Sequence, residues 1–295
     1  MRYRSSERMV DACINVLLIL IGIMVIYPIW FVFIASVSAP DAIANGKVIF
    51  WPKGFTLDGY KILLENKNVW IGYKNSIVYT FVGTIISLAI QITGGYALSR
   101  RSLPGRRILN VLFIITMYFQ GGMIPSFLLI NTLGLYDTMW ALILPGSVSA
   151  FNMIIIRNYF ESNIPEELYD SARIDGCGYF RFFSSIVLPL STGIVAIMTM
   201  YSVQGIWNDY MKAKLYISSF EKRNLQQVIQ GITAKLDSTL NTLEGENYDL
   251  YLAKINEQQL LKYSVVVVAM LPLVILYPFI QKYLVKGVMV GAVKG

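Results

Sequence analysis

The sequence contains no histidine and only two cysteines in 295 residues. The absence of histidine removes the commonest general base and the commonest metal ligand of proteins. Cys13 and Cys177 fall in or beside different hydrophobic regions, and neither belongs to a metal-ligand or Cys-x-x-Cys pattern. We therefore expect no metal or thiol chemistry, and no cofactor bound by this chain.

Charge is also scarce. Asp, Glu, Lys and Arg make up 15% of the residues, whereas soluble globular proteins carry about a quarter. The mean hydropathy is correspondingly high, at +0.55. The net charge of +7 suggests a nucleic-acid partner only if the cations gather on one surface, so their distribution along the chain decides the matter.

The dominant feature is a set of six long uncharged stretches. Each reaches the roughly 18–20 residues that carry a helix across about 30 Å of hydrocarbon. Because lipid offers no hydrogen-bond partner to the backbone, these stretches are expected to be helices. The sequence thus predicts an all-α integral membrane protein with six transmembrane helices in a single domain, residues 1–295. The expected spans are about 12–37, 75–99, 108–131, 138–156, 182–207 and 263–281.

The first stretch has one alternative interpretation. Arg2, Arg4 and Arg8 precede it, as cations precede a secretory signal peptide. However, its apolar core is longer than the roughly 7–15 residues usual for such a signal. We therefore expect an uncleaved span.

The placement of Lys and Arg predicts the orientation. Cations are dense on short segments, and the rest are spread over two longer ones. This contrast predicts that both termini are cytoplasmic and that no nucleic acid is bound. The cation-dense segments are the N-terminal arm, the turn 100–107, the loop 157–181 and the tail after Gln281; the longer external ones are 41–74 and 209–262.

The two external segments differ in character. The first is rich in aromatic residues, including Phe50, Trp51 and Phe55, so it is expected to fold back on the membrane surface. The second, 209–262, is polar and helix-favouring. It is either a solvated connector or, because long loops usually carry function, a functional segment.

The cytoplasmic residues 163–189 form the most informative segment. Ser162 or Asn163 is suited to cap a helix, and Pro165 to occupy its first turn. Glu166 and Glu167 follow where the helix dipole favours anions, and Gly176 and Gly178 permit a sharp turn before a second short helix, about 179–185. Such a helix–turn–helix suits insertion into a groove on another protein. A DNA-binding role is disfavoured, because the segment starts with acids and is held between two spans.

The same segment resembles the signature of bacterial ABC importer permeases. That signature is Glu-Ala-Ala, three residues, Gly, nine residues, Ile, one residue and Leu-Pro. The chain keeps the spacing and places Asp and Ser where the signature has Glu and the first Ala. The matching residues are Asp170-Ser171-Ala172, Gly176, Ile186 and Leu188-Pro189.

Two more elements narrow the resemblance. Trp207-Asn208-Asp209-Tyr210 looks like the Trp-Asn-Asp/Glu element of the family, and the tail from Lys286 to Gly295 looks like the end of the maltose-type second permease. The chain is therefore similar, over essentially its full length, to carbohydrate permeases of the complex-oligosaccharide and polysaccharide branch. This resemblance implies a place in the bacterial cytoplasmic membrane.

The resemblance implies a set of partners. These are a second, different permease, two ATPase subunits that carry ATP and Mg, and an extracellular or lipid-anchored sugar-binding protein that delivers an oligosaccharide. The residues agree on one point: the glycines and lysine between Gly287 and Lys294 do not have the G-x-x-x-x-G-K spacing of a phosphate loop. The chain is thus expected to be a transport subunit and not an enzyme.

Two sets of ATPase contacts follow from the resemblance. In the coupling loop, acids offer charge and small residues allow close approach. In the tail, an extended chain is expected to thread between the ATPases. The candidates are Glu167, Asp170, Ser171, Ala172, Asp175 and Gly176 in the loop, and Gly291 and Lys294 in the tail.

Polar and aromatic residues within the spans are candidates for the sugar path, because sugars need hydrogen-bond partners and an aromatic face. Hydrogen bonding between helices is the alternative use of the same side chains. No charged residue lies within a span, which disfavours an ion-coupled secondary transporter, and the lack of an acid–base set disfavours a membrane-embedded enzyme. The path candidates are Tyr118, Gln120, Asn152, Gln204, Trp207 and Asn208, with Gln91 beside them.

Overall fold

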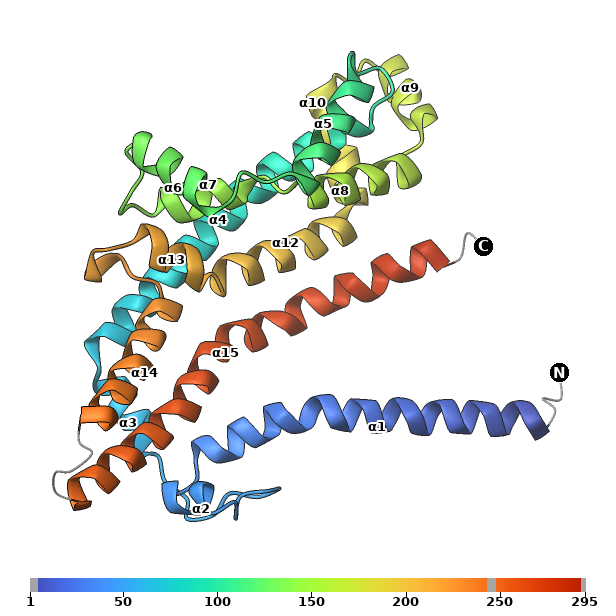
Figure 1. Cartoon of the computed structure of the whole chain (residues 1–295). Helices are drawn as coiled ribbons and strands as arrows, with labels where there is room; N and C mark the ends of the chain where they lie inside the picture. The colour runs from blue at the N-terminus through green and yellow to red at the C-terminus, as the bar shows by residue number, and fades with distance from the viewer. Residues whose placement is uncertain (1–4, 243–247, 293–295) are drawn as a thin grey trace. The chain divides into compact units, whose positions relative to one another are not determined.

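The computed structural model describes residues 5–242 and 248–292, and all regular secondary structure in this part of the chain is helical (Figure 1). This agrees with the expected all-α class. The elements in chain order are α1 (Ser5–Ser36), α2 (Pro40–Ala44), α3 (Asp58–Glu65), α4 (Lys67–Ser99), α5 (Arg106–Tyr118), α6 (Met123–Thr132), α7 (Trp140–Ser147), α8 (Ala150–Asn163), α9 (Glu166–Ile174), α10 (Tyr179–Phe182), a π-helical turn η1 (Phe183–Val187), α11 (Leu188–Leu190), α12 (Thr192–Trp207), α13 (Tyr210–Tyr216), a 3-10 turn η2 (Phe220–Lys222), α14 (Leu225–Thr242) and α15 (Tyr248–Ala292).

Three of these helices are long and apolar enough to cross a membrane by themselves: α1, α4 and α15. Three further stretches are helix pairs that meet that test together but are bent at a short break. The described part of the chain therefore holds three candidate spans, or six if each bent pair is one span. The bends are 113° between α5 and α6, 45° between α7 and α8, and 82° between the α10–α11 stretch and α12.

The breaks fall within the expected spans 108–131, 138–156 and 182–207, and two of them have a local cause. The α5–α6 break contains Gly121 and Gly122, and Gly122 has φ +84°, a backbone conformation that glycine adopts without steric cost. The α11–α12 break follows Leu188-Pro189, where proline removes a backbone donor. Counting uncharged residues does not detect either interruption.

The last helix is longer than its apolar stretch. α15 runs from Tyr248 to Ala292, beyond both ends of the expected span 263–281. Gly287 and Gly291 therefore lie in a helix, and the expectation of an extended tail is wrong as far as Ala292. Lys294 lies outside the described residues.

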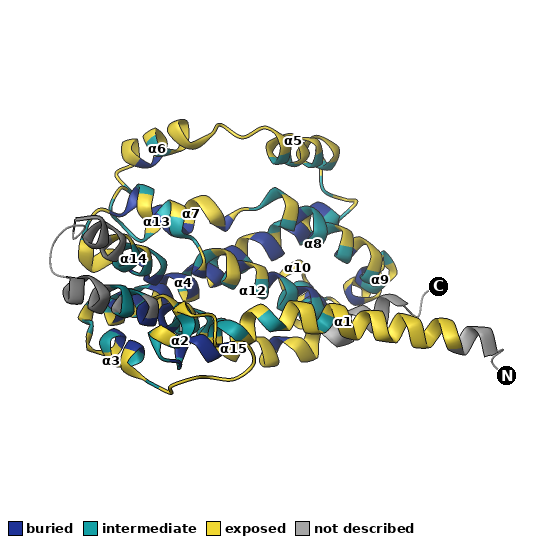
Figure 2. Cartoon of the chain, turned by 60° about the horizontal axis from the view of Figure 1, so that its bottom comes forward, coloured by how far each residue is buried: buried dark blue, intermediate teal, exposed yellow. Residues whose placement is uncertain are grey.

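The chain divides into two compact units. The first consists of residues 1–69 and 229–271. In it α1 exposes apolar side chains along most of its length, as a lipid-facing helix does (Figure 2). The aromatic loop folds back on α1, because Trp30 Nε1 donates to the carbonyl of Phe50 at 2.9 Å and Tyr27 Oη to that of Ile49 at 3.4 Å.

The second unit consists of residues 70–228 and 272–295. It contains two clusters of buried apolar residues. One joins α4, α8, α9, α10, η1 and α12 around Phe160 and Phe182. The other joins α4, α6, α7 and α13 around Tyr79 and Tyr216. The candidate sites lie beside these two clusters.

Candidate functional site

The segment 163–189 begins with a helix that lacks a side-chain cap. Pro165 occupies the position before α9, and the Asn163 amide instead donates to the carbonyl of Tyr159 at 2.9 Å, within α8. The predicted cap by Ser162 or Asn163 is therefore wrong. Glu166 and Glu167 do lie in the first turn of α9 and Arg173 in its last, where they complement the helix dipole.

Gly176 ends α9 in a left-handed turn with φ +76°. The amide of Gly176 donates to the carbonyl of Arg173 at 3.0 Å, and that of Cys177 to the carbonyl of Ala172 at 2.9 Å. This pair of bonds is the Schellman arrangement, in which the residue after the helix cap adopts the left-handed conformation that glycine accepts. A Cβ atom at Gly176 would meet nothing within 4 Å. Within this chain the glycine therefore serves the sharp turn.

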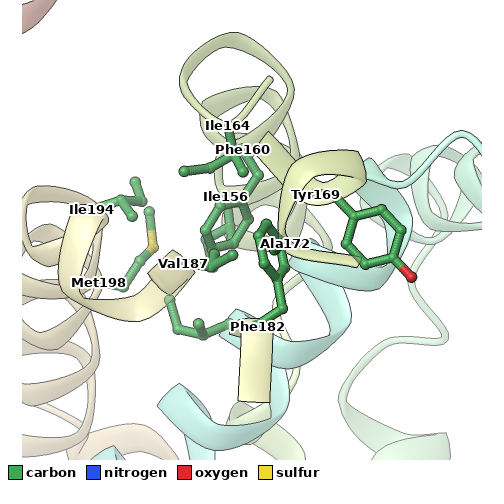
Figure 3. Packing of buried hydrophobic residues seen from close by; sticks show 10 residues of the cluster. Ile156, Phe160, Ile164, Tyr169, Ala172, Phe182, Val187, Ile194 and Met198 are labelled. Atoms are coloured by element: carbon green, nitrogen blue, oxygen red, sulfur yellow. The ribbon is translucent and has the colours of Figure 1, made fainter. Parts of the chain in front are cut away.

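The inner face of α9 is anchored in the chain's own core. Tyr169 and Ala172 are buried, and the Tyr169 ring packs edge-on against Phe182, with centroids 5.2 Å apart (Figure 3). Tyr169 also stacks on Tyr179 at 5.3 Å. Ala172 was expected to allow close approach to a partner. Within this chain its small side chain lets α9 pack closely against this core.

The turn between α4 and α5 supports the same helix. The guanidinium of Arg100 lies 4.5 Å from the centre of the Tyr169 ring, a distance at which a cation is attracted to an aromatic face. A cavity of about 410 Å³ opens beside it, lined by Arg101, Arg106, Glu161 and Glu166 among others. Because both signs of charge line this cavity, it has no strong preference for an anion.

The outer face of the segment is exposed and partly apolar. Ile174, Tyr179 and Phe180 expose 87%, 66% and 83% of their surfaces. We call these three residues the apolar tip. The predicted contacts are also exposed, namely Glu167, Asp170, Ser171 and Asp175. The Ser171 hydroxyl donates to the carbonyl of Glu167 at 2.9 Å.

A π-helical turn follows the tip. It spans Phe183–Val187 and is succeeded directly by Leu188-Pro189. Proline has no N–H, and its ring collides with the carbonyl four residues earlier in a regular helix, so a wider turn relieves both problems. The signature residues Ile186 and Leu188-Pro189 thus coincide with a local change of helix geometry.

The sugar-path candidates fall into two groups. Asn152 is engaged within the chain, donating to Gln91 Oε1 at 3.1 Å, while Gln91 donates to the carbonyl of Ser147 at 2.9 Å. Trp207 is also internal: it is 3% exposed, and its ring packs against Tyr73. By contrast, four candidates are exposed: Tyr118, Gln120, Gln204 and Asn208.

Gln120 lies at the break between α5 and α6, an extended stretch that Figure 2 shows in the colour of exposed residues. A cavity of about 820 Å³ opens there, lined by both sides of the break and by α13. Lys212 and Lys214 of α13 line it. Neither lysine was a candidate in the sequence analysis, because both lie outside the spans. Their closeness in sequence to Trp207-Asn208-Asp209 could have pointed to them.

The far end of the second unit is organised by Asp137. This residue has φ +58°, and its carboxylate accepts the amides of Ser218 and Ser219, both at 2.9 Å, and the ammonium of Lys222 at 2.9 Å. Hydrogen bonds from the hydroxyl and the amide of Ser219 hold the pKa of Asp137 well below its usual range. We call Asp137 and residues 216–222 the aspartate latch.

Comparisons with known proteins match regions that include these segments. The family model of the binding-protein-dependent transport system inner membrane component matches residues 91–290, which include 163–189 and the cavity at the α5–α6 break. Protein LplC of Bacillus subtilis is 38% identical, over 100% of this chain and 98% of that protein.

Two further relatives are described by what they transport. The polygalacturonan/rhamnogalacturonan transport system permease protein YtcP of Bacillus subtilis is 36% identical, over 98% of this chain and 100% of that protein. Among solved structures, a chain of a bacterial ABC transporter involved in the import of the acidic polysaccharide alginate aligns with a TM-score of 0.82 and 30% identity, over 96% of this chain and 99% of that chain.

Proposed function

Because this chain belongs to the binding-protein-dependent transport system inner membrane component family, we propose that it is one of two permease subunits of an ATP-driven importer of oligosaccharides. The partners are a second, different permease, two ATPase subunits that hold ATP and Mg, and an external sugar-binding protein. The relatives LplC and YtcP match nearly the full chain, so the proposal applies to the chain as a whole.

In this proposal each bent helix pair is one span, which makes six spans with both termini in the cytoplasm. Segments 100–107 and 157–181 are then cytoplasmic, and 41–74 and 209–262 external. The α5–α6 break supports the assignment of a pathway, because non-helical backbone at membrane depth is tolerated only where it is buried in protein or lines a water-filled cavity. The break therefore faces the second permease or the sugar path.

The apolar tip is the observation that carries the coupling role. Ile174, Tyr179 and Phe180 are among the more exposed apolar side chains of the second unit, and they lie on a short cytoplasmic segment where lipid does not cover them. Exposed apolar clusters rimmed by polar residues mark protein interfaces. The exposed acids Glu167, Asp170 and Asp175 lie in α9 or at its end, as Ile174 does, and supply polar residues of this kind. The tip is proposed to insert into a groove of an ATPase subunit.

The buried face of α9 can transmit motion of the ATPase to the membrane-spanning helices. Ala172 and Phe182 share one packed cluster with Ile156 of α8 and Met198 of α12 (Figure 3). Protein interiors are close-packed and transmit strain. Displacement of the tip is therefore expected to move α8 and α12 with it. The ATPase shifts the equilibrium between the inward-facing and outward-facing states only if it binds the tip with different affinity in the two states.

The sugar path is proposed to follow the exposed candidates Tyr118, Gln120, Gln204 and Asn208. The C-terminal part of α15, with Gly291, is proposed to approach the ATPases as a helix.

The experiment compares two exposed phenylalanines. Phe180→Ala should weaken recovery of the ATPase subunits with the purified permease by about 30-fold in affinity, because truncating an aromatic interface anchor costs about 2 kcal/mol or more. The matched control is Phe55→Ala, since Phe55 is 69% exposed but belongs to the external aromatic loop. It should leave ATPase recovery unchanged.

Both variants should insert into the membrane normally, because each removes an exposed side chain. Equal recovery of the ATPases by Phe180→Ala and by the wild type, with uptake intact, would contradict the coupling role.

A further inference from the structure

The cavity at the α5–α6 break is suited in size and lining to a small polar ligand. Its volume of about 820 Å³ falls within the range of roughly 300–1,000 Å³ that is typical of small-molecule sites. Gln120 and Ser126 line it with hydrogen-bonding groups, and Phe119, which is 77% exposed, supplies an aromatic face.

The backbone at the break favours a ligand that forms hydrogen bonds. Among the described residues, the amides of Gln120, Gly121 and Gly122 make no backbone hydrogen bond. Discontinuous helices place such free polar groups at substrate sites of membrane transporters, where water or the substrate satisfies them.

The charged residues of the lining are of one sign. Lys212 and Lys214 line the cavity, and no Asp or Glu is among the described lining residues. Lys212 is already paired, because its ammonium lies 2.5 Å from the Asp209 carboxylate. Lys214 lies 5.6 Å from the centre of the Tyr210 ring, and no carboxylate in the described part of the chain lies within ion-pair distance of it. One positive charge at the cavity is therefore uncompensated.

We propose that this cavity binds a sugar carrying a carboxylate, with Lys214 as the residue that selects the charge. The inference rests on the proposed role as an oligosaccharide permease and names the class of sugar: an oligosaccharide of uronic acids. Lys214 Nζ donates to the carboxylate, Phe119 lies against the ring, and Gln120 with the free amides of the break bonds the hydroxyls. The positive charge also raises the local concentration of an anionic sugar at the mouth of the path.

The competing explanation for Lys214 is contact with lipid headgroups, since lysines near the ends of spans commonly reach toward the membrane interface. The two explanations differ in one respect. Recognition of a carboxylate depends on the charge of the sugar, whereas contact with lipid affects every transported sugar equally.

The test uses the complete importer in proteoliposomes, with one binding protein in every arm. Trigalacturonate and its fully methyl-esterified form are the probes, because the ester keeps the rings and removes the charge. Lys214→Gln should lower kcat/KM for trigalacturonate by about tenfold or more, since a hydrogen bond to a charged group is lost. The same variant should change kcat/KM for the ester by less than about twofold.

Two variants complete the design. Lys214→Arg should restore uptake of trigalacturonate to nearly the wild-type value, because arginine keeps the charge. Lys61→Gln removes an exposed lysine of α3, far from the cavity in the sequence, and should leave both probes unaffected.

The proposal is overturned if Lys214→Gln reduces uptake of both probes equally, or of neither. It is also overturned if the wild-type importer takes up a neutral oligosaccharide but not trigalacturonate; the role as an oligosaccharide permease would then stand. Failure of the wild type to take up any oligosaccharide would overturn that role itself.

Discussion

The coupling segment 163–189 and the aspartate latch are held together by different forces. The segment is anchored by packed apolar side chains, among which Phe160 and Phe182 are almost completely buried. The latch is held by the carboxylate of one residue, which accepts two amides, a hydroxyl and an ammonium. In the proposed topology the first lies at the cytoplasmic end of the spans and the second at the external end.

The difference matches what each end has to do. A segment that passes on the motion of an ATPase needs close-packed contacts, which depend little on salt or pH. The external loop instead holds α6, α7 and the 216–222 turn in one arrangement beside the mouth of the sugar path. A carboxylate can accept the several hydrogen bonds that this requires, but their strength depends on the ionisation of the carboxylate.

The largest effect is expected where α4 contacts α8 beside the buried cluster around Phe160 and Phe182, which we call the coupling cluster. A Cβ atom at Gly95 would lie 2.5 Å from Ile156 Cγ2 and 2.8 Å from its Cβ, and a β-branched side chain beside its own backbone cannot move away. Gly95→Ala should therefore lower the free energy of unfolding by about 1–3 kcal/mol through overpacking. The melting temperature of the purified importer measures this loss.

Gly94→Ala is the matched control. A Cβ atom there would meet the terminal methyl of Met153, at 2.5 Å, and methionine adapts readily to such a contact. Gly94→Ala should be close to neutral. If the two variants melted at the same temperature, the packing described for the coupling cluster would be contradicted.

A somewhat smaller and more local effect is expected at the latch. Asp137→Ala removes the acceptor of these hydrogen bonds and should destabilise the 216–222 turn by about 1 kcal/mol, because Ser218 is exposed and Ser219 only partly buried, so that water can bond to the freed donors. Hydrogen exchange at the amides of Ser218 and Ser219 should become faster, while exchange at Phe182 should stay unchanged. Asp137→Asn should be milder, because asparagine accepts amides and tolerates the left-handed backbone. Unchanged protection in Asp137→Ala would show that the latch does not hold the turn.

The smallest effect is a pH dependence confined to the latch. Because its pKa is lowered in the folded state, Asp137 contributes stability that is fully present above the unfolded value of about 3.9. That contribution is lost as the pH falls below this value toward the lowered pKa. Protection at Ser218 and Ser219, corrected for intrinsic exchange rates, should be constant from neutral pH to about pH 5 and then fall in more acidic buffer. Asp137→Asn should abolish this fall; a fall that persisted would assign it to another group.

The coupling segment 163–189 could largely be predicted from sequence, because the position of Gly176 after the predicted helix indicates the turn. Gly176 was expected to form a bend, and it has the left-handed backbone that glycine adopts easily at the end of a helix. The helix cap was mispredicted, because Asn163 is the last residue of α8 and Pro165, which has no capping side chain, takes the position before α9. The exposure of Ile174 and Phe180 could not be predicted, since their helices, of nine and four residues, are too short for periodicity to separate a buried face from an exposed one.

The cavity was harder to predict. Counting uncharged residues does not reveal a break at Gly121 and Gly122, because glycine is uncharged and is also common in membrane helices. Lys212 and Lys214 lie outside every span, so a search for polar residues within the spans passes over them. Trp207 was a reasonable candidate for an aromatic face, yet it is used against Tyr73 instead. Burial of this kind depends on contacts between distant segments.

The central claim, that the apolar tip lies in an ATPase groove, is tested most directly by photo-crosslinking in the intact importer. Phe180 is replaced by p-benzoylphenylalanine, and Phe55 is replaced in the same way as the control. The account predicts that irradiation links position 180 covalently to an ATPase subunit, and that position 55 forms no such adduct. Adducts of position 180 with lipid or with the second permease alone, and none with the ATPase, would contradict it.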